Sequence, residues 1–350
     1  MAGTTFKTIA AVGFALAAAG CEPGKPPPVA GPASETGSGA TAAGVVFTDV
    51  AAESGLSFRN LSGGVDQDLI VESMSAGAAF LDYDGDGWLD LLAVNGTSPG
   101  ASPGEGRNRL FRNEQARPGQ TLRRFREVTG GTGLGSPEWG MGCAVGDYDN
   151  DADPDIYLTY WGPDQLLRND GDGAFADVTA SAGTGDPGWG TSAAFGDLDN
   201  DGLLDLYVVN YLEFDFENPP AGGGKRRYKG LEVFYGPMGI PAQADRLYRN
   251  GGDGLVEVSA ETGIAAHALP GLGVALGDFD GDGDLDIYVA NDSEPNQMYR
   301  NDGAWRFAET GTASRVAFTE DGRPQAGMGV HGGDYDNDGD ADLYVANLND

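Results

Sequence analysis

The sequence contains very few cysteines, histidines and basic residues. It has 2 Cys and 2 His in 350 residues, which excludes a disulfide-rich scaffold, a cysteine-based zinc module and a His-rich catalytic metal site. Only 21 Lys and Arg oppose 54 Asp and Glu, so the formal net charge is −33. Because a surface this negative repels phosphate groups, we expect no nucleic-acid partner.

Long apolar segments are also missing. An apolar run over residues 9–19 follows Lys7, but a bilayer-spanning helix needs about 20 residues. The run fits the core of a secretory signal. Its end, Ala18-Ala19-Gly20-Cys21, resembles a bacterial lipobox in which Cys21 becomes the lipidated first residue, although Leu is usual in place of Ala18. Ordinary signal cleavage after Ala19 is the alternative.

Both interpretations predict an exported protein. We expect an outer-membrane or cell-surface lipoprotein, or otherwise a periplasmic or secreted protein, that meets a membrane only through a lipid anchor. Residues 1–21 are predicted to be the signal peptide with its lipobox-like end. Residues 22–44, rich in Pro, Gly, Ser and Ala, predict a disordered linker. The folded domain is expected over residues 45–350, where the apolar content suffices for a core.

One repeat fills that domain. Five similar Asp-rich segments begin at aspartates spaced by 65, 50, 81 and 56 residues. A second motif, [LM]-[FLY]-R-N, and a third, F-x-[DE]-V-[TS], recur in phase with them. One further copy of the third motif, starting at Phe47, precedes the first unit. The extra length falls in Gly/Pro-rich insertions at residues 97–107 and 211–243.

Each unit predicts four short strands. The first strand ends in the Asp-rich loop, the second follows it, the third carries the R-N motif, and a D-G turn leads to the fourth. In the segment DLYVVN, residues 205–210, both faces are apolar, which indicates a strand buried on both sides. Four-stranded sheets of this length with two covered faces predict an all-β fold, a β-propeller.

The phase of the repeats predicts how the ring would close. The Phe47 copy is expected to be an outermost strand that completes the last blade. The chain ends at Asp350, after the second strand of the fifth unit. We therefore interpret the sequence as a fragment of a longer propeller in which five units are visible.

The Asp-rich loops are the candidate metal sites, and each fits D-x-D-x-D-[GA]-x-x-D. Carboxylates at positions 1, 3, 5 and 9 and the carbonyl at position 7 are expected to converge on one cation. In order of position, the five loops are Asp82, Asp84, Asp86, Trp88 and Asp90; Asp147, Asp149, Asp151, Asp153 and Asp155; Asp197, Asp199, Asp201, Leu203 and Asp205; Asp278, Asp280, Asp282, Asp284 and Asp286; and Asp334, Asp336, Asp338, Asp340 and Asp342.

The donor set points to Ca²⁺. Calcium takes about 6 to 8 oxygen ligands in flexible loops, whereas Mg²⁺ prefers tighter octahedral sites. The absence of a Glu at position 12 excludes an EF-hand. Loop two has Ala152 instead of the turn glycine, followed by Pro154, so we predict that it is the weakest of up to five sites. The alternative, that these are merely solvated turns, fits poorly with mutually repelling carboxylates repeated in register.

The repeats resemble a known family. The segment GDYDNDGDADLYVAN, together with LYRN and F-x-[DE]-V-[TS], resembles the FG-GAP/VCBS repeat of integrin α-subunit propellers. It is also similar to bacterial members of the cartilage acidic protein family, which carry an ASPIC/UnbV-type domain after the propeller. The resemblance implies a seven-bladed ring, here truncated, with Ca²⁺ in the loops. It also implies an extracellular or envelope location and a role in adhesion or in binding proteins or glycans.

Three functions of different classes remain open. The first is a non-catalytic, Ca²⁺-braced scaffold that binds an unknown protein or glycan ligand at the cell envelope. The second is a propeller-based extracytoplasmic enzyme acting on polysaccharide, since a fold does not fix function. The third is a purely structural subunit of an envelope complex. We favour the first, in which the metals brace the blades and need not touch the ligand.

Overall fold

The computed structural model describes residues 46–64, 68–98, 103–117, 123–135, 138–220, 225–228, 231–234 and 236–348. The predicted signal peptide with Cys21 and the predicted linker lie outside the described residues. Within the described part of the chain, no helix has the length and apolar character needed to cross a membrane.

The described chain is almost entirely antiparallel β-sheet. Blade 1 consists of β1 (Ala78–Leu81), β2 (Asp90–Ala93), β4 (Arg109–Gln115) and β5 (Arg123–Glu127); blade 2 of β6 (Trp139–Gly146), β7 (Asp155–Asn169) and β8 (Phe175–Asp177); blade 3 of β9 (Gly190–Gly196), β10 (Asp205–Asn210), β13 (Arg246–Asn250) and β14 (Leu255–Glu257); blade 4 of β15 (Gly271–Gly277), β16 (Asp286–Asn291), β17 (Gln297–Asn301) and β18 (Phe307–Glu309); and blade 5 of β19 (Gly327–Gly333) and β20 (Asp342–Asn347). The predicted all-β, four-stranded repeat is confirmed.

Short elements lie between or beside the blades. They are η1 (Ile70–Ser73), β3 (Pro103–Gly106), α1 (Thr179–Ala182), β11 (Lys225–Tyr228), β12 (Leu231–Phe234), α2 (Ser259–Thr262) and η2 (Ile264–Ala266). Blade 2 differs from the prediction because its second and third strands form one continuous strand, β7. Only a short link separates the two halves there, and Gly162, at φ 113°, lies within it.

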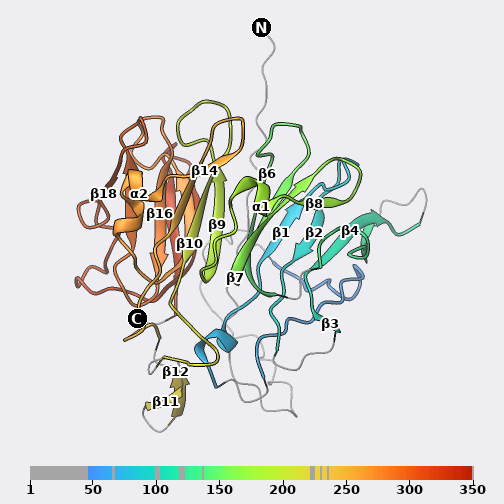
Figure 1. The fold of residues 1–350 in the computed structure, drawn as a ribbon, viewed down its shortest axis with the longest axis horizontal. Coiled ribbons are helices and arrows are strands. Elements are labelled where there is room, and N and C mark those ends of the chain that lie inside the picture. The colour runs from blue at the N-terminus through green and yellow to red at the C-terminus, as the bar shows by residue number, and fades with distance from the viewer. Residues whose placement is uncertain are drawn as a thin grey trace, which may run out of the picture.

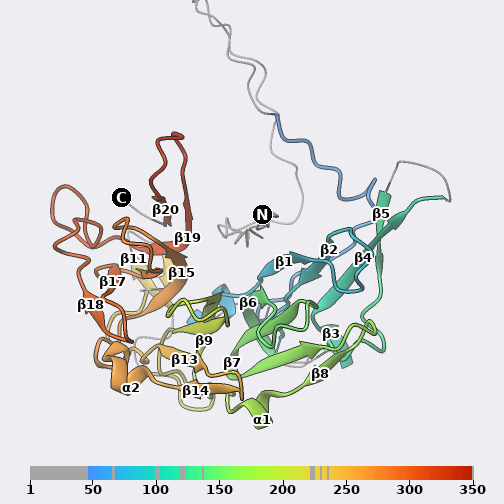
Figure 2. The ribbon, with the colours of Figure 1, turned by 90° about the horizontal axis from the view of Figure 1, so that it is seen from above.

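The blades lie side by side in chain order (Figure 1), and the view from above shows that they form an open arc (Figure 2). Figure 2 shows the first strand of each blade, β1, β6, β9, β15 and β19, on the inner side of the arc. The outermost strands β8, β14 and β18 lie on the outer side. The sheets do not close into a ring, and blades 1 and 5 lie at opposite ends of the arc. The architecture is therefore a propeller-like array of blades, and ring closure remains a prediction.

The hydrophobic core lies between neighbouring blades. All six residues of β10 are buried. Leu206 and Val208 pack with the side of blade 2 that carries Tyr157, whereas Tyr207 and Val209 pack with Ile287 and its neighbours in blade 4. Burial of both faces of this strand is thus confirmed. Because each blade covers a face of the next, the repeats stabilise one another through apolar contacts.

Glycines allow the inner strands to approach closely. A Cβ added at Gly142 in β6 would lie 2.6 Å from the carbonyl oxygen of Thr191 in β9. Real Cβ atoms do not come this near to a backbone atom, so only glycine fits at this point.

The N-terminal segment lies against blade 1. Residues 46–50 form no strand, and the side chain of Phe47 is 94% exposed. Within the described residues no strand pairs with this segment, so its role as the outermost strand of a completed last blade stays a prediction. The turn after it, residues 51–55, does contact blade 1, where the carbonyl of Ser54 accepts a hydrogen bond from the amide of Phe125.

The 211–243 insertion folds back on the blades. Phe216 contacts Trp139 and Trp161 at ring-centroid distances of 5.3 and 4.6 Å, and Tyr211 contacts Trp189 at 5.0 Å. These contacts bury the aromatic part of the insertion against the inner strands. Its tip forms the hairpin β11–β12.

Candidate metal loops on the blades

Each Asp-rich loop joins the first strand of a blade to the second. In blade 1 the loop runs from the end of β1 to Asp90, the first residue of β2. Since every loop connects the same two strands, the five loops occupy equivalent places along the arc. The structure thus places all five predicted sites in the same structural context.

Backbone amides hold the carboxylate at position 1. In loop one, Asp82 Oδ1 accepts a hydrogen bond from the amide of Asp86 at 3.0 Å, and Oδ2 accepts one from Gly87 at 2.7 Å. The same pair of bonds recurs at Asp147, Asp197, Asp278 and Asp334. These bonds fold the loop into a tight turn around its own first side chain.

Two residues of each loop adopt positive φ. Position 6 does so as predicted, and Ala152 does so at φ 78°, the conformation that its glycine counterparts adopt. An alanine there is strained by about 1 kcal/mol, which is consistent with the prediction that loop two is the weakest. Position 4 also has positive φ and is always Gly or Asn, a pattern that the sequence analysis missed. Its residues are Gly85, Asn150, Asn200, Gly281 and Asn337.

The aspartate at position 9 is buried in blades 1 to 4. Asp205 Oδ1 accepts the amide hydrogen of Asn250 at 2.8 Å, and Oδ2 accepts that of Leu198 at 2.9 Å. Asp90, Asp155 and Asp286 make the equivalent bonds. This side chain therefore ties the second strand to both the loop and the third strand. In blade 5, Asp342 accepts the bond from the loop, at Tyr335, and the described residues include no third strand there to supply the second bond.

Burial and neighbouring carboxylates raise the pKa of these aspartates. Burial is the largest cause at Asp90, whose pKa rises to about 6, and at Asp155 and Asp205, whose pKa rises to about 7. The aspartates at positions 3 and 5 raise the pKa further, while backbone hydrogen bonds lower it. A cation at the centre of the loop would relieve both the repulsion and the cost of desolvation.

In loops one and three, one carboxylate oxygen of the position-3 aspartate has no hydrogen-bond partner. Asp84 Oδ2 contacts Arg112 at 2.7 Å, and Asp199 Oδ2 contacts Arg249 at 3.1 Å. The Trp305 indole also donates to Asp199 Oδ2, at 2.8 Å. In both aspartates Oδ1 is buried and has no hydrogen-bond partner. A buried carboxylate oxygen without a partner is costly and is expected to meet a ligand.

The structure brings together part of the predicted ligand set. In loops one, two, three and five, carboxylate oxygens of positions 1, 3 and 9 lie within 4.8 Å of one another. In loop four the corresponding group is Asp278, Asp280 and Asp282, at positions 1, 3 and 5. Position 5 of the other loops lies outside these groups. In all five loops position 5 accepts the amide hydrogen of position 7. Coordination by the position-7 carbonyl remains a prediction.

The R-N motif contributes to the loops, which the sequence analysis missed. The sequence identified Arg112, Arg168 and Arg249 only as part of a strand, but each places its guanidinium against the position-3 aspartate of its own blade. The recurrence of an R-N motif after each of the first four acidic loops was the available signal. The arginine neutralises part of the loop charge and fixes one oxygen of the aspartate.

The asparagine of the motif links neighbouring blades. Asn250 Nδ2 in blade 3 donates to the carbonyl of Tyr148, at position 2 of the blade 2 loop, at 2.7 Å. Asn169 and Asn301 make the same bond to Tyr83 and Leu198 of their preceding blades, at 2.9 and 2.7 Å. The loops are therefore held by the next blade as well as by their own.

The aspartate loop and the R-N motif that contacts it together match a known repeat. Residues 82–158, 147–208, 231–289 and 278–345 match the FG-GAP-like repeat, and these segments cover more than half of the chain. The chain belongs to the FG-GAP-like repeat family. The predicted family is confirmed. The segments 82–158, 147–208 and 278–345 each begin at the Asp-rich loop of one blade and end in the second strand of the next.

The FG-GAP-like chain is similar to cartilage acidic protein 1. It is 30% identical to the Xenopus tropicalis protein over 106 residues and 31% identical to the Homo sapiens protein over 108 residues. Each match covers 29% of this chain, but only 16% and 15% of those relatives. The chain thus matches less than a fifth of the length of these curated relatives.

Solved structures with β-rich repeats overlap with it partially. An Agrocybe aegerita lectin that recognises non-reducing terminal N-acetylglucosamine has a TM-score of 0.39 at 12% identity, with coverage of 77% of this chain and 60% of the lectin. The V. cholerae biofilm matrix protein Bap1 has a TM-score of 0.38 at 14% identity, with coverage of 82% of this chain and 37% of Bap1.

Proposed function

We propose that this FG-GAP-like protein is an exported, Ca²⁺-braced propeller scaffold that binds a protein or glycan ligand at the cell envelope. One observation carries the metal assignment. At Asp84 and Asp199 an arginine holds one carboxylate oxygen, while the other is buried without a partner beside the aspartates of positions 1 and 9. An all-oxygen donor set in a flexible loop fits Ca²⁺.

The residues present fit such an ion. Positions 1, 3 and 9 would hold it, with position 5 replacing position 9 in loop four. The ion would supply positive charge to a cluster of carboxylates, and no step of catalysis is assigned to it. Because the position-9 aspartate also bonds to the third strand, filling the loop would stiffen the connection between three strands of a blade.

The test is thermal unfolding of residues 45–350 in excess chelator, in millimolar Ca²⁺ and in millimolar Mg²⁺. A ligand that binds only the folded state at about 100 times its Kd stabilises by about 2.7 kcal/mol per site. We expect Ca²⁺ to raise the melting temperature well above the value in chelator, and Mg²⁺ to raise it less. Equal midpoints in chelator and Ca²⁺ would exclude metal bracing.

A matched pair of variants localises the effect. Asp199→Asn removes a carboxylate from loop three, whereas Asp321→Asn removes one from an exposed turn outside the loops. Both change the net charge equally. Bound Ca²⁺, measured by equilibrium dialysis, should fall by about one ion in the first variant and stay unchanged in the second.

Export and anchoring need a separate experiment. The protein expressed with its own first 21 residues should fractionate with membranes and incorporate labelled palmitate. Cys21→Ala should abolish the label. If the unlabelled variant and the unchanged protein both appear soluble in the periplasm or medium, ordinary cleavage replaces lipidation in the proposal.

A further inference from the structure

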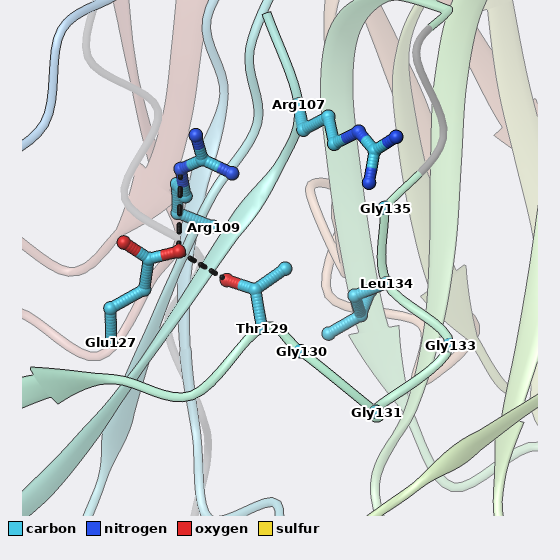
Figure 3. A pocket seen from close by; sticks show the side chains of 9 residues that line it. All are labelled: Arg107, Arg109, Glu127, Thr129, Gly130, Gly131, Gly133, Leu134 and Gly135. Carbon is cyan, nitrogen blue, oxygen red and sulfur yellow. Dashed lines mark hydrogen bonds and ion pairs between the residues drawn. The ribbon is translucent and has the colours of Figure 1, made fainter. Parts of the chain in front are cut away.

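A cavity of about 450 Å³ opens in blade 1 where β4 begins and β5 ends. Arg107 and Arg109, Glu127, Thr129 and the glycine-rich turn after β5 line it (Figure 3). In Figure 3 Arg109 extends toward Glu127, and Arg107 extends toward Gly135. The volume lies in the range of small-molecule sites, roughly 300–1,000 Å³, and the lining is mostly polar.

The two arginines of the cavity differ in their hydrogen-bond and ion-pair partners. Glu127 Oε1 accepts a hydrogen bond from Thr129 Oγ1 at 3.2 Å and lies 3.5 Å from Arg109 Nε. Arg107 is exposed, and within the described residues its side chain has no hydrogen-bond or ion-pair partner. One guanidinium is therefore oriented by a neighbour, while the other keeps its donors for a ligand.

The cavity departs from the repeat in two ways. Pro163, Ala244 and Pro295 stand at the place of Arg107 in blades 2, 3 and 4. The turn also differs, because blades 2 and 3 have the helical turns α1 and α2 where blade 1 has Gly130 and Gly131. Gly131 adopts φ 92°, which is incompatible with a right-handed helix.

The two glycines leave the space open. A Cβ added at Gly130 or Gly131 would meet no atom within 4 Å. The equivalent cavity of blade 2 is lined by Asp177, Thr179 and Ala180, and no basic side chain borders it. A cavity of about 610 Å³ thus recurs at this place in blade 2. What blade 1 adds is a basic lining, because Arg107 has no basic counterpart in blades 2 to 4, and the fold of the blade does not require that arginine.

The surrounding charge favours an anion. Residues 107–126 contain seven arginines and one glutamate, in a chain with a net charge of −33. Several of these arginines already pair with acidic neighbours. The local excess of positive charge would nevertheless attract an anionic ligand to this end of the arc, and salt would weaken that attraction.

The mixture of groups defines the ligand. Guanidinium groups bind planar carboxylates with paired hydrogen bonds. Glu127 repels a compact phosphate or sulfate but accepts hydrogen bonds from hydroxyl groups. A ligand that carries a carboxylate beside several hydroxyls satisfies both. We propose that this cavity binds a uronic-acid residue of an acidic polysaccharide, which rests on the proposed function and specifies its ligand class.

The test uses trigalacturonic acid as the probe, with its methyl ester as an uncharged sugar of the same shape. Binding is measured by calorimetry in the presence of Ca²⁺. Arg107→Gln should weaken binding of the acid at least fivefold. Arg124→Gln is the matched control, because Arg124 is an exposed arginine of the same hairpin outside the cavity. It should change affinity less than twofold.

A second variant tests the space itself. Gly130→Phe adds bulk to the lining at a position where a Cβ fits, and should abolish binding of the acid while the melting temperature in Ca²⁺ stays within about 2 °C. Since both cavity variants keep all five loops, Ca²⁺ bridging to the sugar would affect them and the unchanged protein equally.

The outcomes separate this inference from the proposed function. Four results would each overturn the cavity assignment. The first two are that Arg107→Gln binds trigalacturonic acid as tightly as the unchanged protein, or that Arg107→Gln and Arg124→Gln lose equal affinity. The other two are that the methyl ester binds as tightly as the acid, or that inorganic sulfate competes as well as the acid. None of these results alters the Ca²⁺-dependence of melting, on which the scaffold proposal depends.

Discussion

The backbone carbonyl of Ser54 accepts a hydrogen bond from the amide of Phe125 at 2.7 Å. In the next blade, the carbonyl of Thr132 accepts the same bond from Phe175 at 2.8 Å. Ser54 and Thr132 occupy the same position after the F-x-[DE]-V-[TS] motif. The N-terminal segment therefore contacts blade 1 as the end of blade 1 contacts blade 2. It takes the place of the closing turn of a preceding blade.

This contact predicts a local effect of Gly55→Ala. Gly55 has φ 79°, and an added Cβ would lie 2.9 Å from the carbonyl oxygen of Phe125. The substitution should speed hydrogen exchange of residues 51–56 and of the Phe125 amide. Gly183→Ala is the control, because Gly183 has φ 70° but an added Cβ meets nothing within 4 Å. Equal exchange in residues 51–56 of both variants would contradict a docked turn.

The hydrogen bond from the R-N asparagine to the preceding blade predicts an effect on global stability. Asn250→Ala removes bonds to Tyr148 and Leu204 and leaves buried carbonyls unsatisfied, so it should lower the free energy of unfolding by about 2–3 kcal/mol. Asn113→Ala is the comparison. Asn113 donates to the carbonyl of Leu89 in its own blade. Its replacement should lower the free energy of unfolding clearly less than Asn250→Ala does. Denaturant titration in Ca²⁺ measures both, and equal losses would remove the inter-blade explanation.

The loops should differ in their dependence on position 5. Asp282 belongs to the carboxylate group of loop four, whereas Asp151 lies outside the group of loop two and directly precedes the strained Ala152. Asp282→Ala should therefore reduce bound Ca²⁺ and the melting temperature more than Asp151→Ala. The reverse order in paired dialysis and melting experiments would show that the role of position 6 has been misread.

A buried aspartate predicts a pH effect outside the metal loops. Burial raises the pKa of Asp245 from 3.8 to about 7, so its protonated form favours folding. The stability that this group contributes is fully present below about pH 4 and is lost as pH rises through 7. Asn108 and Asn296 hold the equivalent position in blades 1 and 4 and accept the same backbone bond.

Asp245→Asn should therefore be tolerated and should lose this pH dependence. The melting temperature of the variant relative to the unchanged protein should rise by several degrees between pH 5 and pH 8. Calcium binding to the loops also varies with pH, but it affects both proteins and cancels in the difference. A difference that stays constant across this range would refute the raised pKa.

The sequence by itself determined the repeat, the strand content and the loops. Local chemistry decides these features, since Asp and Gly at fixed spacing make a tight turn and alternating apolar residues make strands. The segment DLYVVN predicted a doubly buried strand, and β10 is one because blades 2 and 4 cover its two faces. Position 4 of the loops is always Gly or Asn in the sequence, and the structure explains this choice by the positive φ that each of these residues adopts.

Tertiary structure alone decided which distant groups meet. The contacts of Arg112 with Asp84, of Trp305 with Asp199 and of Asn250 with Tyr148 join residues that are 28 to 106 positions apart. No local pattern fixes such pairs, because they depend on how one blade packs on the next. The same holds for the cavity at Arg107, where a turn that adopts no helix brings glycines beside two arginines, and for residues 46–50, which need a partner strand before they can become one.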